Sequence, residues 1–162
     1  MRPDVIALPN VSALKDSARC SGLTDDHIWL WEAYSLAGGL ARLDVLLWEV
    51  SNADLCHKIV NLEAQVRSGQ LVKVSLDEHV WLPRFQFARN YSMFPAVPRA
   101  IACLPARFSE LDVALWFCSS NHWLEYQAPM DIAEFAGESL VAAAQAQNFE
   151  RTFSWQGSAG QK

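Results

Sequence analysis

The sequence predicts a mainly α-helical fold that contains one short β-hairpin. Apolar residues recur three and four positions apart in several stretches, a spacing that gathers them on one face of a helix. Capping residues precede most of these stretches, and glycine or proline follows them. β-Branched and aromatic residues are enriched between residues 71 and 82, which is typical of strands.

The first helix is expected to begin directly after Thr24, whose hydroxyl suits a helix N-cap. Asp25 and Asp26 then lie in the first turn, where the positive end of the helix dipole stabilises their charge. Gly38 and Gly39 predict the end of this helix, because glycine adopts the left-handed conformation in which many helices terminate.

Two further helices are expected before residue 70. The apolar stretch Leu40 to Val50 predicts the first of them, because its leucines recur at the helical spacing. Ser51 and Asp54 approximate a capping box, which predicts that the next helix begins there. Gly69 should end that helix.

After this glycine the pattern becomes that of a β-hairpin, with strands over 71–74 and 79–82 around a polar turn. Two helices followed by a hairpin give residues 1–80 the outline of a winged helix-turn-helix, which reads DNA with its second helix. The basic candidates for DNA contact are Lys58, Arg67 and Lys73. The alternative is a small helical domain that uses the same helices for dimer or partner contacts.

Prolines and caps divide residues 81–162 into a second, small helical domain with a C-terminal tail. Pro98 suits the first position of a short helix that Pro105 ends. Ser109 and Asp112 form a predicted capping box for a helix from Glu110 to Cys118. The inward residues of that helix should be Leu111, Ala114, Leu115 and Cys118.

The last two helices are expected to be separated by a glycine. Pro129 opens a helix that runs through Phe135 and stops at Gly137. The alanine-rich stretch Ser139 to Gln147 predicts the final helix, and residues 148–162 form a tail with little core of its own.

Charge and hydropathy exclude several classes of function. The chain has 13 Lys and Arg against 18 Asp and Glu, a net charge of −5, whereas tight non-specific binding to DNA or RNA depends on cations that replace phosphate counterions. No uncharged apolar run approaches the roughly 20 residues of a membrane-spanning helix, so we expect a cytoplasmic protein. The cysteines show no CxxC spacing and are expected to be reduced core thiols: Cys20, Cys56, Cys103 and Cys118.

The sequence contains no recognised catalytic or cofactor motif, and we expect neither catalysis nor a bound cofactor or metal. A Gly-rich phosphate loop, an HExxH motif and a GxSxG motif are absent. Cys118 and His122 lie four residues apart and could pair a thiolate with a base on one helix face. Against this pairing, Asn121 and the turn after it are expected to break the helix.

Aromatic residues are more informative than titratable ones. The chain has 7 tryptophans, of which Trp116 is expected in the core and Trp123 in a loop. Phe149, Phe153 and Trp155 fall in the tail. Large aromatics in such places favour a protein partner, because they are enriched where interfaces bind most strongly. The alternative is that the tail docks on its own domain.

An ordered set of motifs runs from residue 82 to residue 131. Its residues are Leu82-Pro83-Arg84-Phe85-Gln86-Phe87, Phe94-Pro95, Ile101, Leu104-Pro105, Ser109, Val113-Ala114-Leu115-Trp116, Asn121, Leu124, Pro129 and Asp131. In order and spacing this set resembles the toxin-binding domain of Xre/MbcA/ParS-type bacterial antitoxins, and the resemblance covers about residues 82–147. Glu125 and Tyr126 stand where that family usually has glycines, and Ile132 stands where leucine is common.

The resemblance implies a mostly helical, dimer-forming antitoxin that holds a RES-type or ParT-like toxin, an enzyme acting on NAD, in a blocked state. In that family the C-terminal part covers the entrance to the toxin's active site, and the antitoxin has no catalytic role. The residues that would contact the toxin here are Trp116, Asn121, Trp123, Leu124, Pro129, Asp131, Phe149, Arg151, Phe153 and Trp155.

Two other functions stay open. One is a DNA-binding transcriptional regulator without a toxin partner, and an antitoxin of this kind could itself repress its own operon. The other is a small enzyme with an unrecognised site, which would require a cleft with convergent titratable groups.

Overall fold

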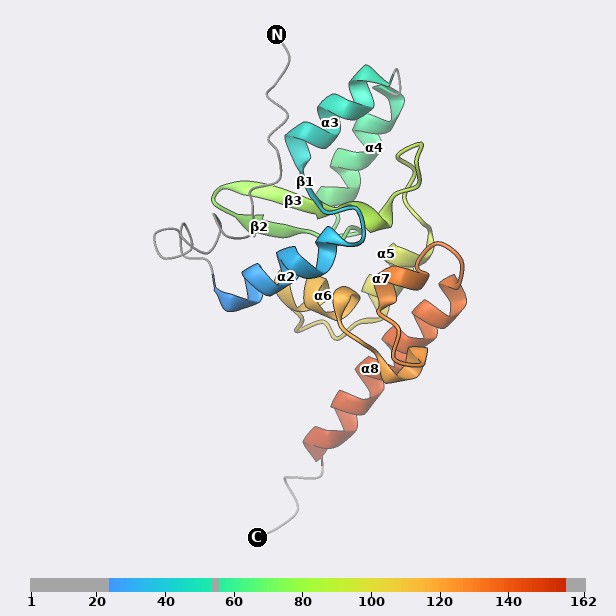
Figure 1. Ribbon diagram of the computed structural model, residues 1–162. Coiled ribbons are helices and arrows are strands. Elements are labelled where there is room, and N and C mark those ends of the chain that lie inside the picture. Colours follow the sequence, from blue (N-terminus) through green and yellow to red (C-terminus); the bar gives the residue numbers. More distant parts are fainter. Residues whose placement is uncertain (1–23, 54–55, 157–162) are drawn as a thin grey trace.

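The computed structural model describes residues 24–53 and 56–156. Over these residues the chain is mainly helical with one small antiparallel sheet, which confirms the predicted fold class (Figure 1). In chain order the elements are α2 (Asp25–Ser35), β1 (Leu40–Arg42), α3 (Leu43–Asn52), α4 (Cys56–Arg67), β2 (Val74–Leu76), β3 (His79–Pro83), η1 (Arg84–Gln86), α5 (Ala96–Cys103), α6 (Glu110–Cys118), η2 (His122–Leu124), α7 (Pro129–Ile132) and α8 (Gly137–Gln156).

The sheet has the strand order β1-β3-β2, and both pairings are antiparallel. Strands β2 and β3 form the predicted hairpin, with Ser75 opposite Val80. Strand β1 was not expected, because Leu40–Arg42 was assigned to a helix, and that prediction is wrong. The Gly39 carbonyl accepts a hydrogen bond from the Arg84 N–H (3.0 Å). This bond places residues 40–42 beside β3, and α3 begins only after them.

The expected helix boundaries of the N-terminal region hold in part. Thr24 is the N-cap of α2, and Gly69, at φ +70°, follows the end of α4 as predicted. Ser51 does not begin a helix, because it lies in the last turn of α3. The apolar stripe formed by Leu46 and Val50 is buried, and this packing carries α3 past the serine.

Two hydrophobic clusters hold the fold together. The smaller one lies between α3, α4 and the sheet and comprises Ala41, Leu46, Leu62, Val66, Leu71 and Leu82. The larger cluster joins α2 and the sheet to α5, α6, α7 and α8. Figure 1 shows the sheet between the α3–α4 pair and these other helices. The larger cluster contains residues from both sides of position 80, and the Tyr34 hydroxyl donates to the Ala114 carbonyl across it (2.7 Å).

The segment Leu82–Phe87 connects the sheet to the second half of the chain. Gln86 in this segment is fully buried, and its amide hydrogen-bonds both the N–H and the carbonyl of Val72 (2.9 Å each). The same amide nitrogen donates to the Pro83 carbonyl (3.0 Å). Arg84 makes two hydrogen bonds to the Glu49 carboxylate (2.9 and 2.6 Å), which joins η1 to α3. The sequence pattern P-x-F-Q-F therefore builds a polar junction.

Helices α5 and α6 begin with different signals. Helix α5 starts at Ala96, so Pro98 is its third residue rather than its first; a proline is tolerated there because first-turn N–H groups have no intrahelical acceptor. Helix α6 has the predicted bounds and the capping box of Ser109 and Asp112. Its buried residues are Ala114, Trp116, Phe117 and Cys118, while the expected inward residues Leu111 and Leu115 are only partly buried.

The C-terminal helices differ from the prediction at a glycine. Helix α7 ends at Ile132, not at Phe135, and Gly137 begins α8 instead of stopping a helix. A Cβ atom at position 137 would lie 2.8 Å from the Cβ of Ala96, so the glycine permits α5 and α8 to pack closely. Helix α8 continues to Gln156, which includes part of the stretch expected as a loose tail.

Candidate protein-binding surface

The residues singled out for toxin contact divide into a buried group and an exposed group. The buried group is Trp116, Asn121, Leu124 and Pro129. Trp123 is 49% exposed, Phe149 is 65% exposed, and Asp131 is exposed as well. The side chains of Arg151, Phe153 and Trp155 lie outside the described residues. Sequence reasoning missed Tyr126, which is 76% exposed.

Asn121 organises the turn that carries the exposed aromatics. Its side-chain oxygen accepts from the Trp123 N–H (2.9 Å), and its carbonyl accepts from the N–H groups of Leu124 (3.0 Å) and Tyr126 (2.9 Å). The Asn121 N–H in turn donates to the Gln127 carbonyl (3.1 Å). Leu124, 5% exposed, anchors the turn in the larger core. The buried members of the pattern therefore hold Trp123 and Tyr126 at the surface.

Two consecutive residues of this turn adopt the left-handed conformation. Glu125 has φ +54° and Tyr126 has φ +66°. These are the positions at which the resembled family usually has glycines, and only glycine adopts this conformation without steric cost. The departure from the glycine pattern was a sequence signal for Tyr126 that could have been used. Backbone strain of this kind clusters at binding and active sites, but Asp77, Glu78 and Tyr91 adopt the same conformation in other turns of this chain, so the strain alone does not mark a site.

Replacing Glu125 by glycine is expected to stabilise the protein. The glycine relieves the strain at φ +54°, and we expect the free energy of unfolding to rise by roughly 0.5–1 kcal/mol, measured by urea denaturation. A matched Glu134→Gly variant, in the turn after α7, has no left-handed residue to relieve and should gain nothing. A loss of stability in Glu125→Gly would contradict the assignment of strain.

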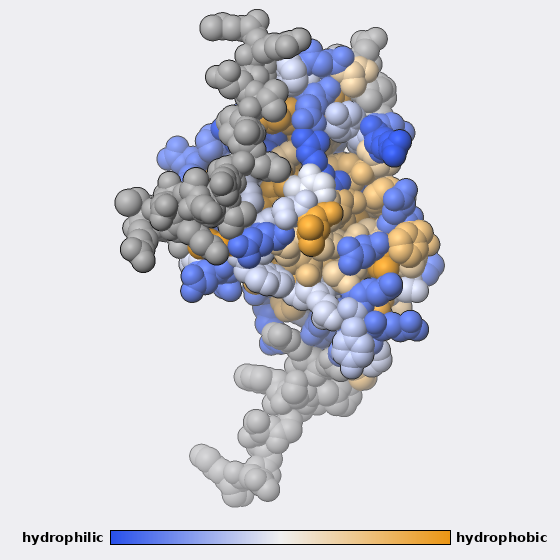
Figure 2. All heavy atoms as spheres, viewed as in Figure 1, coloured by the Kyte–Doolittle hydropathy of each residue, from blue (hydrophilic) through white to orange (hydrophobic). Residues whose placement is uncertain are grey.

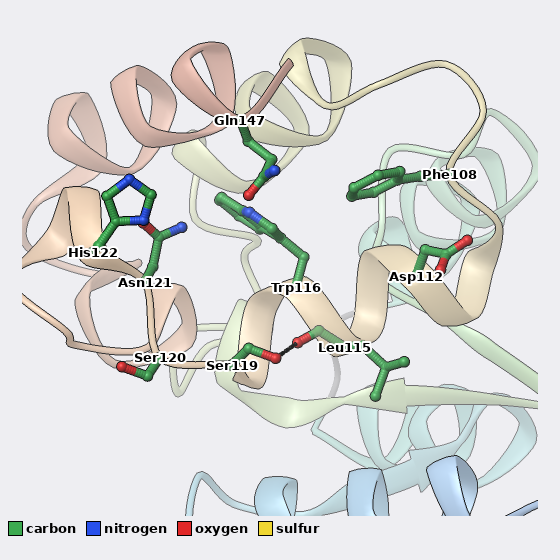
Figure 3. A pocket seen from close by; sticks show the side chains of 9 residues that line it. All are labelled: Phe108, Asp112, Leu115, Trp116, Ser119, Ser120, Asn121, His122 and Gln147. Atoms are coloured by element: carbon green, nitrogen blue, oxygen red, sulfur yellow. Dashed lines mark hydrogen bonds between the residues drawn. The ribbon is translucent and has the colours of Figure 1, made fainter. Parts of the chain in front are cut away.

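A cleft of about 260 Å³ lies beside this turn, between α6, η2 and α8 (Figure 3). Figure 3 shows Trp116 in its middle, with Phe108 on one side, Asn121 and His122 on the other, and Gln147 reaching down from α8. The hydroxyl of Ser119 donates to the Leu115 carbonyl (2.6 Å) and is therefore committed to its own helix. The cleft combines aromatic walls with amide groups.

The thiol of Cys118 is not arranged as a nucleophile. Its Sγ donates to the Ala114 carbonyl (3.3 Å), and the residue is 8% exposed. Burial raises the pKa of this thiol to about 12, so the reactive thiolate is not formed near neutral pH. His122 lies beyond the end of α6, in η2, and its ring packs against Trp123 with centroids 4.7 Å apart.

We expect Cys118 to resist alkylation by iodoacetamide in the folded protein at pH 9, while the half-buried Cys103 reacts. Folding raises the pKa of the Cys118 thiol, so its contribution to the free energy of unfolding is fully present at neutral pH. Above the ordinary thiol value of 9.0 the unfolded chain ionises this thiol while the folded protein keeps it neutral, so the contribution is lost as the pH rises towards 12. Mass spectrometry of peptides after timed labelling measures both rates. Equal labelling of the two cysteines would contradict the buried, neutral thiol.

Two of the candidate DNA contacts, Arg67 and Lys73, line one cleft, which Glu110 also lines. Lys73 forms an ion pair with Glu110 (2.9 Å), and Arg67 is exposed at the end of α4. The side chain of Lys58 lies outside the described residues. The hairpin turn consists of Asp77 and Glu78, whose charge repels phosphate.

Apolar side chains also reach the surface elsewhere. Figure 2 shows apolar atoms on the face viewed in Figure 1, around the C-terminal end of α2 and α7. Leu36, at the end of α2, is 92% exposed, and Phe135, in the turn after α7, is 74% exposed.

Comparisons with known proteins return no match: no family model, no curated protein and no solved structure is similar to this chain. Among the described residues, no three His, Cys, Asp or Glu side chains are grouped as a metal site would require. Within the same residues, no helix combines the length and apolar content needed to cross a bilayer.

Proposed function

We propose that this protein is an antitoxin, a stoichiometric inhibitor that binds an NAD-consuming toxin of the RES or ParT-like type and blocks its active site. The chain acts as a binding protein without catalysis of its own, and the proposal includes a homodimer. The observation that carries the proposal is the exposure of Trp123 and Tyr126 on a turn that the core holds in place, together with the exposure of Phe149 on α8.

The packing around these aromatics supports a binding role. The ordered motif from Leu82 to Asp131 contributes buried residues at Gln86, Trp116 and Leu124. These members of the pattern form part of the packed interior, and the aromatics Trp123 and Tyr126 stay exposed. The large apolar rings of exposed Trp and Tyr side chains are in unfavourable contact with water until a partner covers them. Both residue types are enriched in interface hot spots. Helix η2 (His122–Leu124) contacts α8, the helix that carries Phe149.

The test is a toxicity rescue assay with the protein encoded beside this gene. We expect that protein to be toxic when expressed alone and harmless when this chain is co-expressed, and affinity purification should recover both together. The proposal fails if the neighbouring product is harmless alone, or if it remains toxic on co-expression.

A DNA-binding regulator is the second candidate, favoured by the order of α3, α4 and the β2–β3 hairpin. The Lys73–Glu110 ion pair and the acidic hairpin turn weaken it. If DNA is bound through α4, Lys58→Ala with Arg67→Ala should abolish a gel shift with the DNA upstream of the gene and leave toxin binding intact. An unchanged gel shift would remove this region from DNA recognition.

A further inference from the structure

The indole N–H of Trp116 is a buried hydrogen-bond donor that has no acceptor among the described residues. Trp116 is 8% exposed, and it lines the cleft between α6, η2 and α8. A buried donor without an acceptor is destabilising, and proteins rarely leave one unpaired. Two other indoles share this property, Trp31 and Trp81, but they pack edge to face against each other with centroids 4.6 Å apart and do not line this cleft.

Other amide groups converge on the same place. The side-chain oxygen of Asn121 accepts from the Trp123 N–H, which leaves its amide nitrogen on the side of the cleft. Figure 3 shows that nitrogen directed towards Trp116, and it shows the Gln147 amide above the indole. The hydroxyls of Ser119 and Ser120 already donate to backbone carbonyls. The groups around the indole are therefore two N–H donors, from Trp116 and Asn121, and the Gln147 amide, which can both donate and accept.

These groups suit a neutral ligand that offers both a carbonyl oxygen and an N–H, such as a peptide group. Asp112 also lines the cleft, and its carboxylate disfavours carboxylates and phosphates. At about 260 Å³ the cleft lies just below the roughly 300–1,000 Å³ typical of small-molecule sites, so a segment of chain that enters it must be short. Gln86 shows in this same fold how a glutamine amide pairs with both the N–H and the carbonyl of one residue.

We propose that the cleft binds a short extended segment of the partner protein through its main chain. One backbone carbonyl accepts the Trp116 indole N–H, and the Gln147 amide pairs with a peptide group of the segment. In the absence of a ligand the indole nitrogen is covered. The half-buried Gln147 side chain therefore moves aside when the partner's backbone carbonyl enters the cleft. The exposed Trp123 directly follows His122, which lines the cleft, so it is placed to contact a bound partner. Phe149 lies two positions after Gln147 on α8 and therefore faces a different side of that helix. The inference rests on the proposed function only for the identity of the partner, the toxin.

A peptide-group probe tests the cleft without any toxin. N-methylacetamide is titrated into the full-length protein with ¹⁵N-labelled tryptophan, and the Trp116 indole resonance is assigned through Trp116→Phe. We expect that resonance to shift downfield with saturation, while sodium acetate and tetramethylammonium chloride at equal concentrations leave it unchanged. Gln147→Met should weaken probe binding about fivefold, the effect of one neutral hydrogen bond. The matched control Gln145→Met, an exposed position on α8, should have no effect.

The proposal is overturned if the Trp116 resonance does not move, if acetate moves it equally, or if Gln147→Met binds the probe like the wild type. It is also overturned if removal of residues 157–162 alone changes that resonance as probe binding does, because the chain's own C-terminus would then be the occupant. Since no toxin is present, a negative result leaves the antitoxin proposal standing. If the cleft binds the amide saturably but the toxicity rescue fails, the cleft is still a peptide-binding site and the toxin is rejected as its partner.

Discussion

Replacing Gln86 by methionine is expected to cost about 3–5 kcal/mol of folding free energy, because three hydrogen bonds are lost inside the protein. Methionine matches the length of glutamine but can neither donate to the carbonyls of Val72 and Pro83 nor accept from the Val72 N–H. Gln86 and Val72 are both 0% exposed, so water does not replace the amide. The melting temperature should fall by about 10–15 °C.

Gln145→Met provides the control, since Gln145 is an exposed residue of α8. Its melting temperature should stay within about 2 °C of the wild type, as is usual for surface substitutions. Gln86→Glu separates hydrogen bonding from shape, because glutamate keeps the acceptors and loses the donor, and it should be destabilised as well. A Gln86→Met protein that melts with the wild type would show that the junction between Val72 and η1 does not hold the fold together.

Truncation after Gln147 is expected to leave a folded protein that inhibits the toxin at least tenfold less well, a loss of about 1.4 kcal/mol of binding free energy. Among the described side chains of α8, residues 137–149, the last buried one is Ala144, so we expect the truncated helix to keep its packing against α5. Phe149 is 65% exposed and is removed together with Arg151, Phe153 and Trp155. The melting temperature should change by only a few degrees.

Phe149→Ala in the full-length chain locates the effect of the truncation. It should reproduce part of the lost inhibition, whereas Ala142→Ser, an exposed change on the same helix, should inhibit like the wild type. If the truncated protein unfolds, the segment after Gln147 is structural. If it folds and inhibits as before, the contact surface lies elsewhere, around residues 121–129.

Local signals predicted the parts of the fold that depend on local chemistry. The capping box of Ser109 and Asp112, the N-cap at Thr24 and the stop at Gly69 all appear as expected, because each acts within one turn of helix. The errors lie where distant packing decides. The apolar spacing of Leu40–Arg42 predicts a helix, but these residues pair with β3. Gly137 was expected to stop a helix, but it begins α8 and leaves room for the Ala96 side chain.

The candidate surface was predicted only in part for the same reason. The exposure of Trp123 and Phe149 agrees with the sequence, in which aromatics outside the predicted core stand out, and their contact with a partner stays a prediction. Tyr126 was missed, since its exposure follows from the left-handed turn that Asn121 organises. In the sequence Gln86 is only one residue of a motif. Its hydrogen bonds to Val72, 14 residues away in the chain, can be recognised only from the structure.

The antitoxin account is tested most directly by titrating this protein against the NAD consumption of the purified neighbouring gene product. If the protein is an antitoxin, inhibition is complete at a fixed stoichiometry, and Trp123→Ala with Phe149→Ala weakens it strongly. Trp29→Ala, which replaces an exposed tryptophan on α2, should inhibit like the wild type. A neighbouring product that consumes no NAD, or one whose activity is unchanged by an excess of this protein, would contradict it.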